Sequence, residues 1–119
     1  MELNILGTIY QAEFKDYKDD PYFESNHCSG YCNALGKRIV ICLADTMPDN
    51  EDITKEENAR YEKLTMRHEI LHAFLYESGL DASSLDPGNG GWARNDEMVD
   101  WFAAQFPKIL SVYQVAGCL

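Results

Sequence analysis

The stretch 54–78 constrains the fold most, because it has the pattern of one long helix. Thr54 and Glu57 have the spacing of a capping box, which marks the first turn of a helix, and Gly79 suits the end of it. Apolar residues recur at helical intervals and predict the buried face: Tyr61, Leu64, Ile70, Leu71, Phe74 and Leu75. The remaining chain must therefore cover one side of this helix.

Two of the three histidines of the chain lie in this helix, at positions 68 and 72. Residues four apart share a helix face, so His68 and His72 can direct both imidazoles to one point. Glu69 lies about 100° around the helix from His68. Zinc hydrolases use this His-Glu-x-x-His arrangement: two neutral nitrogen ligands and a carboxylate that takes a proton from water. We predict one Zn²⁺ ion bound by His68 and His72, with Glu69 as the catalytic base, rather than three unrelated polar residues on a solvated face.

Strand patterns precede this helix. Residues 2–14 alternate apolar and polar side chains and predict one strand. Residues 31–35 and 38–44 predict a β-hairpin around Gly36 and Lys37, and the second of its strands is rich enough in Ile and Val to be central or well covered. The stretches 15–28 and 45–53 are acidic, contain proline and are expected to be loops.

A second helix is predicted after the first. Asn95 suits its N-cap, and four residues should face inward: Val99, Phe102, Ala103 and Phe106. Pro107 should interrupt it, with a short helix over 108–115. The glycine-rich stretch 81–94 between the two helices is expected to be a loop, either a substrate flap or a simple connection.

These elements predict an α+β fold over a single domain, residues 1–119. A small antiparallel or mixed sheet of about three strands should pack on the long helix and on a second, C-terminal helix, as a minimal zincin-like core. No apolar run approaches the ~20 residues of a membrane span, and no secretion signal is recognisable. We therefore expect a cytoplasmic protein without a membrane partner.

The net charge and the cysteines limit which partners and which further metal sites we expect. The net charge is −10, from 20 acidic and 10 basic residues, which disfavours nucleic-acid binding. The four cysteines are expected to be free thiols: Cys28, Cys32, Cys42 and Cys118. His27, Cys28 and Cys32 form half of a zinc site at best, and their spacing favours packing as small apolar side chains instead.

A catalytic zinc site normally has three protein ligands and one open position. A carboxylate at the start of the second helix suits the third ligand, because the helix dipole stabilises the anion there. Glu97 is our prediction because its side chain reaches further. Asp96 is the alternative, since it alone is four residues from Asp100. Asp100 would then accept a hydrogen bond from the outer nitrogen of a ligand histidine. A purely capping role for this acidic turn is the third possibility.

Over about residues 38–110, the His68–His72 helix and the run Glu97–Ala104 resemble the minimal zinc metallopeptidase core of ImmA/IrrE-type proteins. Short phage- and prophage-encoded metallopeptidases look closer still. The downstream Gly and His of metzincins are replaced by Leu75 and Ser78, so the resemblance is to the gluzincin class, in which a carboxylate completes the site. It implies a bacterial or phage-infected bacterial cell and a protein substrate, since ImmA/IrrE proteins cleave a partner repressor.

The resulting expectation is a zinc-dependent metalloendopeptidase that hydrolyses a protein or peptide substrate lying extended along a sheet edge. Tyr76, Tyr113 and Arg94 are candidates for stabilising the oxyanion. The alternative is a non-proteolytic, zinc-stabilised interaction or structural protein of a phage or mobile element. Glu69 favours the enzyme, because a structural site needs no base. A DNA-associated SprT-like protease shares the motif but fits the acidic charge poorly.

Overall fold

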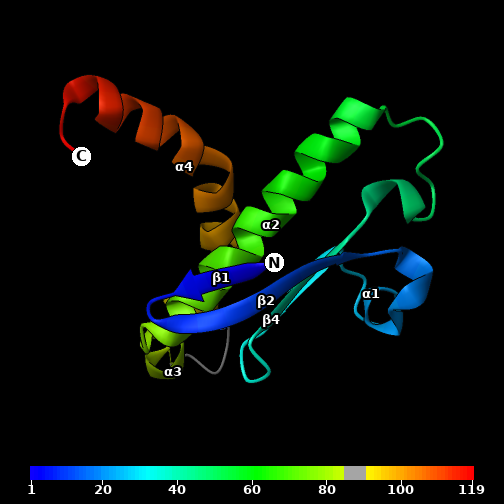
Figure 1. The fold of residues 1–119 in the computed structure, drawn as a ribbon, viewed down its shortest axis with the longest axis horizontal. Helices are drawn as coiled ribbons and strands as arrows, with labels where there is room; N and C mark the ends of the chain where they lie inside the picture. Colours follow the sequence, from blue (N-terminus) through cyan, green and yellow to red (C-terminus); the bar gives the residue numbers. More distant parts are fainter. Residues whose placement is uncertain (85–90) are drawn as a thin grey trace.

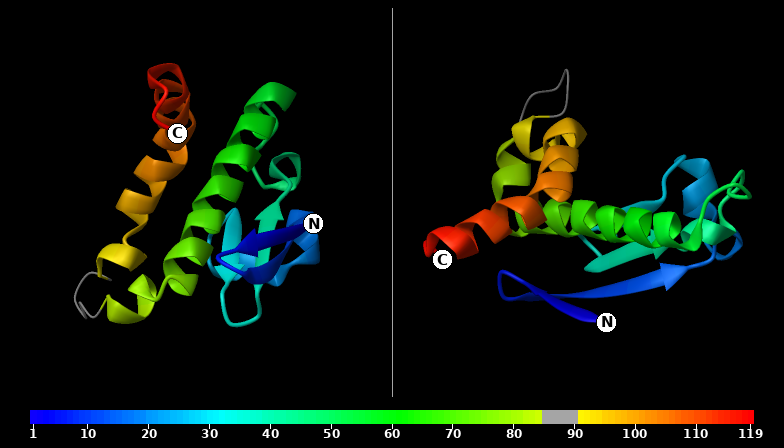
Figure 2. Two further views of the ribbon diagram at one scale, coloured as in Figure 1. Left: turned by 60° about the vertical axis from the view of Figure 1, so that its left-hand side comes forward. Right: turned by 90° about the horizontal axis from the view of Figure 1, so that it is seen from above.

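The computed structural model describes residues 1–84 and 91–119 and has an α+β fold (Figure 1). A mixed four-stranded sheet packs against the long helix α2 (Lys55–Glu77), and a second long helix, α4 (Asp96–Ala116), packs on α2. Figure 2 shows α4 on the side of α2 that faces away from the sheet. Among the described residues, no helix combines the length and the apolar character that crossing a membrane requires.

The sheet has the order β1-β2-β4-β3, one strand more than predicted. Its strands are β1 (Glu2–Ile5), β2 (Thr8–Lys15), β3 (Gly30–Asn33) and β4 (Arg38–Cys42). β2 and β4 are parallel, and the other two pairs are antiparallel.

The single strand predicted over residues 2–14 is wrong, because the chain reverses at Leu6 and Gly7. Both residues have a positive φ, +51° and +91°, as a tight two-residue hairpin requires. The Asn4 side chain supports the turn by accepting a hydrogen bond from the Gly7 N–H at 2.7 Å. Leucine rarely adopts this conformation, so the sequence reads through the turn as continuous strand.

The predicted hairpin of β3 and β4 is confirmed, and β4 lies inside the sheet. Ile39, Val40 and Ile41 are fully buried. Ile39 and Ile41 belong to the main core, which includes Tyr10 of β2 and Ala73 of α2. Val40 belongs to a smaller core with Phe23 and Cys42. Phe23 comes from α1 (Pro21–Ser25), which, with the short 3-10 turns Tyr17–Asp19 and Ala44–Thr46, forms where loops were expected.

The capping box of α2 is present as predicted, with both of its hydrogen bonds. Gly79 is left-handed, at φ +83°, and separates α2 from the short helix α3 (Leu80–Ser83). The predicted buried face is partly wrong: Tyr61 and Phe74 are exposed, while Met66, Ile70 and Ala73 meet the sheet. Helix and sheet approach each other closely. At Gly30, for example, a Cβ atom would lie only 2.7 Å from the Thr65 methyl carbon.

The second helix begins as predicted but does not end at Pro107. After the 3-10 turn Trp92–Arg94, the Asn95 side chain caps α4 by accepting from the Met98 N–H at 2.9 Å. Val99 and Ala103 are buried, whereas Phe106, predicted to face inward, is 47% exposed. The helix continues to Ala116. Of the predicted glycine-rich loop, residues 85–90 lie outside the described residues.

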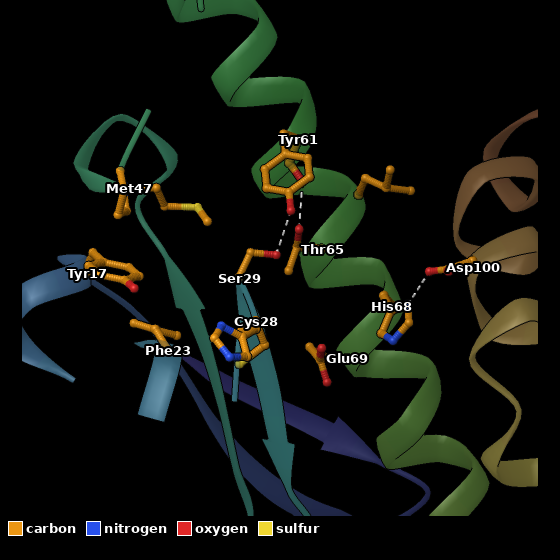
Figure 3. A pocket seen from close by; sticks show the side chains of 14 residues that line it. Tyr17, Phe23, Cys28, Ser29, Met47, Tyr61, Thr65, His68, Glu69 and Asp100 are labelled. Carbon is orange, nitrogen blue, oxygen red and sulfur yellow. Dashed lines mark hydrogen bonds and ion pairs between the residues drawn. The ribbon is translucent and has the colours of Figure 1, made fainter. Parts of the chain in front are cut away.

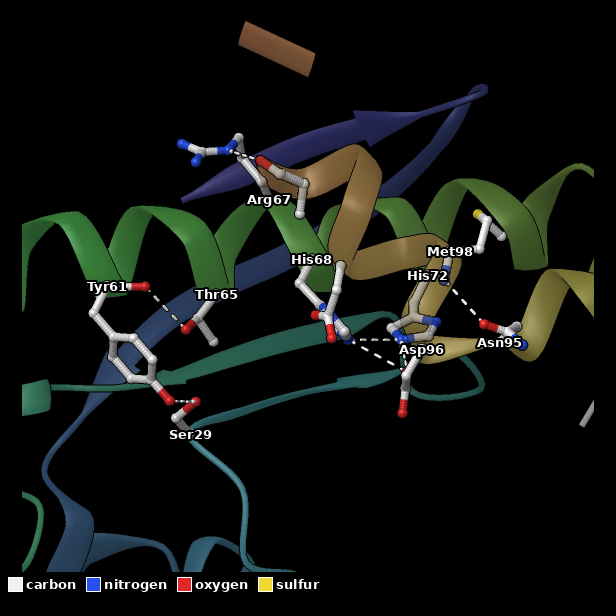
Figure 4. A network of polar contacts seen from close by, with 11 residues as sticks. Ser29, Tyr61, Thr65, Arg67, His68, His72, Asn95, Asp96 and Met98 are labelled. Carbon is white, nitrogen blue, oxygen red and sulfur yellow. Dashed lines mark hydrogen bonds and ion pairs between the residues drawn. The ribbon is translucent and has the colours of Figure 1, made fainter. Parts of the chain in front are cut away.

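Proline within α4 is accommodated by a contact from α2. Pro107 has no N–H, so it cannot donate the helical hydrogen bond to the carbonyl of Ala103, four residues earlier. Arg67 of α2 donates to that carbonyl through its Nε at 2.6 Å (Figure 4). The carbonyl that the proline leaves without a helical donor is thus satisfied by α2, and α4 continues beyond Pro107.

Candidate metal centre

Helix α2 brings the predicted histidine pair together. The Nε2 atoms of His68 and His72 are 3.0 Å apart, and both rings are partly buried. One ligand atom from each of His68, Glu69 and His72 lies within 4.8 Å of the other two. The four-residue spacing of one helix therefore produces the predicted convergence.

The first two turns of α4 bring two carboxylates to this pair, that of Asp96 (Figure 4) and that of Asp100 (Figure 3). Asp96 Oδ1 lies 3.0 Å from His72 Nε2 and 3.5 Å from His68 Nε2. Asp100 Oδ1 lies 2.7 Å from His68 Nδ1, at the opposite side of that ring. A hydrogen bond from Nδ1–H to Asp100 leaves the lone pair of His68 on Nε2, which is the atom that faces His72 and Asp96.

Glu97, our predicted third ligand, is not brought to the histidines. Its side chain is exposed, and no hydrogen bond or ion pair joins it to either histidine in the part of the chain that the structure describes. Successive helix positions differ by about 100°, so Glu97 points elsewhere when Asp96 faces α2. A sequence signal for Asp96 exists: with Val99, Asp100 and Ala103 it follows the i, i+3, i+4, i+7 pattern of one helix face.

The spacing of the three converging atoms fits one zinc ion. His68 Nε2, His72 Nε2 and Asp96 Oδ1 are separated by 3.0, 3.0 and 3.5 Å. Tetrahedral zinc with bonds near 2.05 Å places its ligand atoms about 3.3 Å apart. Two imidazoles and one carboxylate are also a donor set that catalytic zinc uses. The residues present therefore fit such an ion.

Glu69 lies beneath this cluster and is 7% exposed. Burial raises the pKa of its carboxyl to about 7, and the nearby Asp96 and Asp100 act in the same direction. His68 and a backbone hydrogen bond from Cys32 oppose that rise in pKa. Burial, together with His68, lowers the pKa of His72, while Asp96 opposes this. A neutral imidazole at neutral pH is the form that can bind a metal.

A cleft of about 450 Å³ borders the cluster and follows the free edge of β3. The Cys42 N–H donates to the Ser29 carbonyl, so Tyr31 and Asn33 are the β3 residues that exchange hydrogen bonds with β4. The backbone groups of Gly30 and Cys32 consequently point away from β4. The sequence predicted the hairpin but not its register. It therefore could not show which β3 residues direct their backbone groups away from β4.

The three candidates for stabilising the oxyanion lie in different surroundings. Tyr76 lines the cleft with His72 and Asp96, and Lys37 Nζ lies 4.9 Å from the centre of its ring. Arg94 instead pairs with Asp81 at 3.3 Å. Tyr113 is exposed near the far end of α4.

The second half-site at His27, Cys28 and Cys32, which the sequence disfavoured, is not assembled among the described residues. Cys28 and Cys32 are half-buried free thiols, and burial raises the pKa of each, that of Cys32 to about 12. Within residues 1–84 and 91–119, the single group of three or more potential metal ligands is the one around His68, Glu69 and His72.

Comparisons with protein-family models, curated proteins and solved structures gave no match.

Proposed function

We propose that this chain is a zinc-dependent metalloendopeptidase of the gluzincin type, with His68, His72 and Asp96 as zinc ligands. The observation that carries the proposal is the convergence of these three side chains on one point above a buried Glu69. We assign Asp96 rather than Glu97, because of these two acids Asp96 is the one that contacts the histidines. The likeness of the motifs to ImmA/IrrE-type proteins supports the same class.

The bound zinc would polarise a peptide carbonyl and make a water molecule acidic enough to be deprotonated near neutral pH. Glu69 is suited to remove that proton, because its carboxyl is buried beside the two histidines, and in the metal-free protein this burial already raises its pKa. It would then return the proton to the leaving amine. Asp100 would hold the His68 ring in place through Nδ1. Tyr76 is the candidate donor to the developing oxyanion.

The substrate would bind as an extended strand along the free edge of β3. The backbone carbonyls of Gly30 and Cys32 point away from β4, on the side of the cleft that holds Glu69 and the histidines, while the Cys32 N–H donates to Glu69. Main-chain hydrogen bonds of this kind align a peptide whatever its side chains.

The test combines metal content with cleavage. Protein loaded with zinc is incubated with a mixture of blocked peptides, and products are identified by mass spectrometry. We expect one zinc ion per chain and cleavage that Glu69→Gln reduces at least about 1,000-fold, in the range of a lost general base and its electrostatic effect. Glu97→Gln, one residue from the assigned ligand, serves as the matched control and should retain activity.

Two outcomes would contradict the proposal. Absence of zinc binding would remove the metal centre altogether. Stoichiometric zinc without cleavage of any peptide, or cleavage that Glu69→Gln leaves intact, would favour the non-proteolytic zinc-stabilised protein instead.

A further inference from the structure

A second cavity, of about 380 Å³, opens on the other flank of His68 and Glu69 (Figure 3). Its far wall is aromatic and aliphatic and comes from four separate parts of the chain: Tyr17, Phe23, Met47, Pro48, Tyr61 and Leu64. No lysine or arginine lines it among the described residues. The cavity is therefore polar where it meets the metal centre and apolar away from it.

The exposed rim of this cavity is held in place by hydrogen bonds. Tyr61 is 45% exposed, yet its hydroxyl donates to Ser29 Oγ at 2.8 Å, which fixes the ring between α2 and the start of β3 (Figure 3). A large aromatic side chain partly open to solvent and anchored through its polar end is a typical recognition surface.

The segment that carries Met47 and Pro48 is also tied to α2. The Ala44 N–H donates to the Glu62 carboxylate at 2.9 Å. Farther along, the amides of Asn50 and Asn58 exchange two hydrogen bonds, of 2.9 and 3.0 Å. Asn58 is buried, so this pair is shielded from water. The wall of the cavity is thus formed before any ligand binds, which lowers the entropic cost of binding.

We propose that this cavity binds a bulky apolar side chain, such as Leu, Met or Phe, of the residue next to the bond that is cut. The substrate class is accordingly an extended peptide segment with such a residue beside the scissile bond. This inference rests on the proposed peptidase function, because it uses His68 and Glu69 as the reacting side of the cavity. Its volume falls in the range of pockets that enclose small apolar ligands.

Selectivity is the quantity to measure. One methylene group gained or lost in an apolar pocket changes kcat/KM by about 10- to 200-fold. A library of blocked peptides of equal length, randomised on both sides of the centre, is digested by the zinc-loaded protein. We expect Leu, Met or Phe at one flanking position of the cut bond to be preferred over Ala by about 10- to 100-fold.

Variants of Leu64, which lines the cavity from α2, should change this preference. Leu64→Phe partly fills the cavity and should shift the preference toward small residues, whereas Leu64→Ala enlarges it and should favour Phe over Leu. Lys63→Ala is the matched control, since Lys63 is exposed on the same helix and does not line the cavity. Thermal unfolding of each variant checks that it is folded. If one of the two Leu64 variants does not fold, the other still tests whether Leu64 sets the preference.

A binding measurement separates this proposal from the peptidase function. Metal-free wild-type protein is titrated with N-acetyl-leucinamide and N-acetyl-alaninamide, and amide NMR shifts are followed. Shifts at Tyr61 and Thr65 with the leucine compound alone support the pocket even if no peptide is cleaved, in which case the peptidase function fails. Cleavage without any apolar preference overturns the pocket and leaves the peptidase. No cleavage and no shifts overturn both.

Discussion

Asp96 and Glu97 are adjacent and differ by one methylene group, yet only Asp96 of the two is in contact with the histidines. Asp96 Oδ1 contacts both Nε2 atoms, and Glu97 faces solvent. The helix geometry of α2 made the relation of His68 to His72 predictable, because both belong to one helix. The choice between the two acids depends on the rotation of α4 about its axis, which the packing of Val99 and Ala103 sets. Side-chain length was therefore the wrong criterion for predicting which acid lies against the histidines.

The first prediction concerns these two acids. Asp96→Asn removes the anionic ligand and should weaken zinc binding by more than about 100-fold, beyond the effect typical of an outer-sphere residue. Asp100→Ala, which removes the acceptor for His68 Nδ1–H, should weaken it by about 10- to 100-fold. Glu97→Gln should leave the affinity unchanged. Competition with a chromogenic chelator measures all three. Loss of affinity in Glu97→Gln, with Asp96→Asn unaffected, would reverse the assignment.

The second prediction concerns the buried carboxyl of Glu69. Its pKa rises from 4.5 to about 7 on folding, so between these pH values the folded protein holds a proton that the unfolded chain has lost. The stability that this group contributes is present below pH 4.5 and is lost as pH rises to about 7. Metal-free Glu69→Gln, which cannot ionise, should therefore be more stable than wild type above pH 7, by about 3 kcal/mol.

Urea unfolding of both metal-free proteins across this pH range measures the difference in free energy. The gap between variant and wild type should shrink toward acid pH, where both side chains are neutral. A gap that does not vary with pH would show that Glu69 does not titrate in the way its burial implies.

Helices and strands were predictable from the sequence where residues close to them in the chain determine where they begin and how they pack. The capping box of α2, the Asn95 cap and the apolar strand β4 are local patterns, and all three are confirmed. The Leu6-Gly7 turn runs against the preference of leucine, and the carbonyl that Pro107 leaves without a helical donor accepts from Arg67, forty positions before the proline. Nothing in the sequence around Pro107 indicates the Arg67 contact, and Gly7 alone did not outweigh the strand pattern on both sides of the turn.

The third prediction concerns that distant partner. Arg67→Ala leaves the Ala103 carbonyl without a donor in a largely buried helix contact, which should reduce the free energy of unfolding by about 1–3 kcal/mol. Arg60→Ala, an exposed arginine earlier in the same helix, is the control and should have little effect. Chemical denaturation monitored by circular dichroism gives both values.

Pro107→Ala restores an amide N–H at position 107, which can then donate to the Ala103 carbonyl within α4. Arg67→Ala should accordingly be less destabilising in that background than in wild type. This double-mutant comparison isolates the contact from the general loss of an arginine side chain. Equal destabilisation in the two backgrounds would mean that Arg67 stabilises the protein by other contacts.

For the whole molecule, the candidate zinc ligands come from two helices that differ in how firmly they are held. α2 packs on the sheet, whereas α4 packs chiefly on α2 and its outer half is exposed (Figure 1). A metal bound by His68, His72 and Asp96 would join the two helices, so its binding energy becomes stability of the α2–α4 contact.

The fourth prediction follows from that difference. Adding zinc should slow amide hydrogen exchange in residues 98–104 of α4, and a chelator should reverse the effect. Exchange in β4, which is already buried in the core, should change little. Hydrogen exchange read by mass spectrometry resolves the two segments. Equal slowing throughout the chain would indicate that zinc stabilises the molecule as one cooperative unit, and no slowing in α4 would exclude Asp96 as a ligand.

The free edge of β3 has a consequence for solubility as well as for binding. Unpaired strand edges are where proteins join one another into aggregates, and natural sheets usually protect them. Gly30 is buried, so the half-buried Cys32 must stay accessible if a peptide is to pair with this edge. The strand is only four residues long, and the chain carries a net charge of −10, so copies that approach edge to edge repel one another. High salt, which screens that repulsion, is accordingly the condition in which this protein should aggregate first.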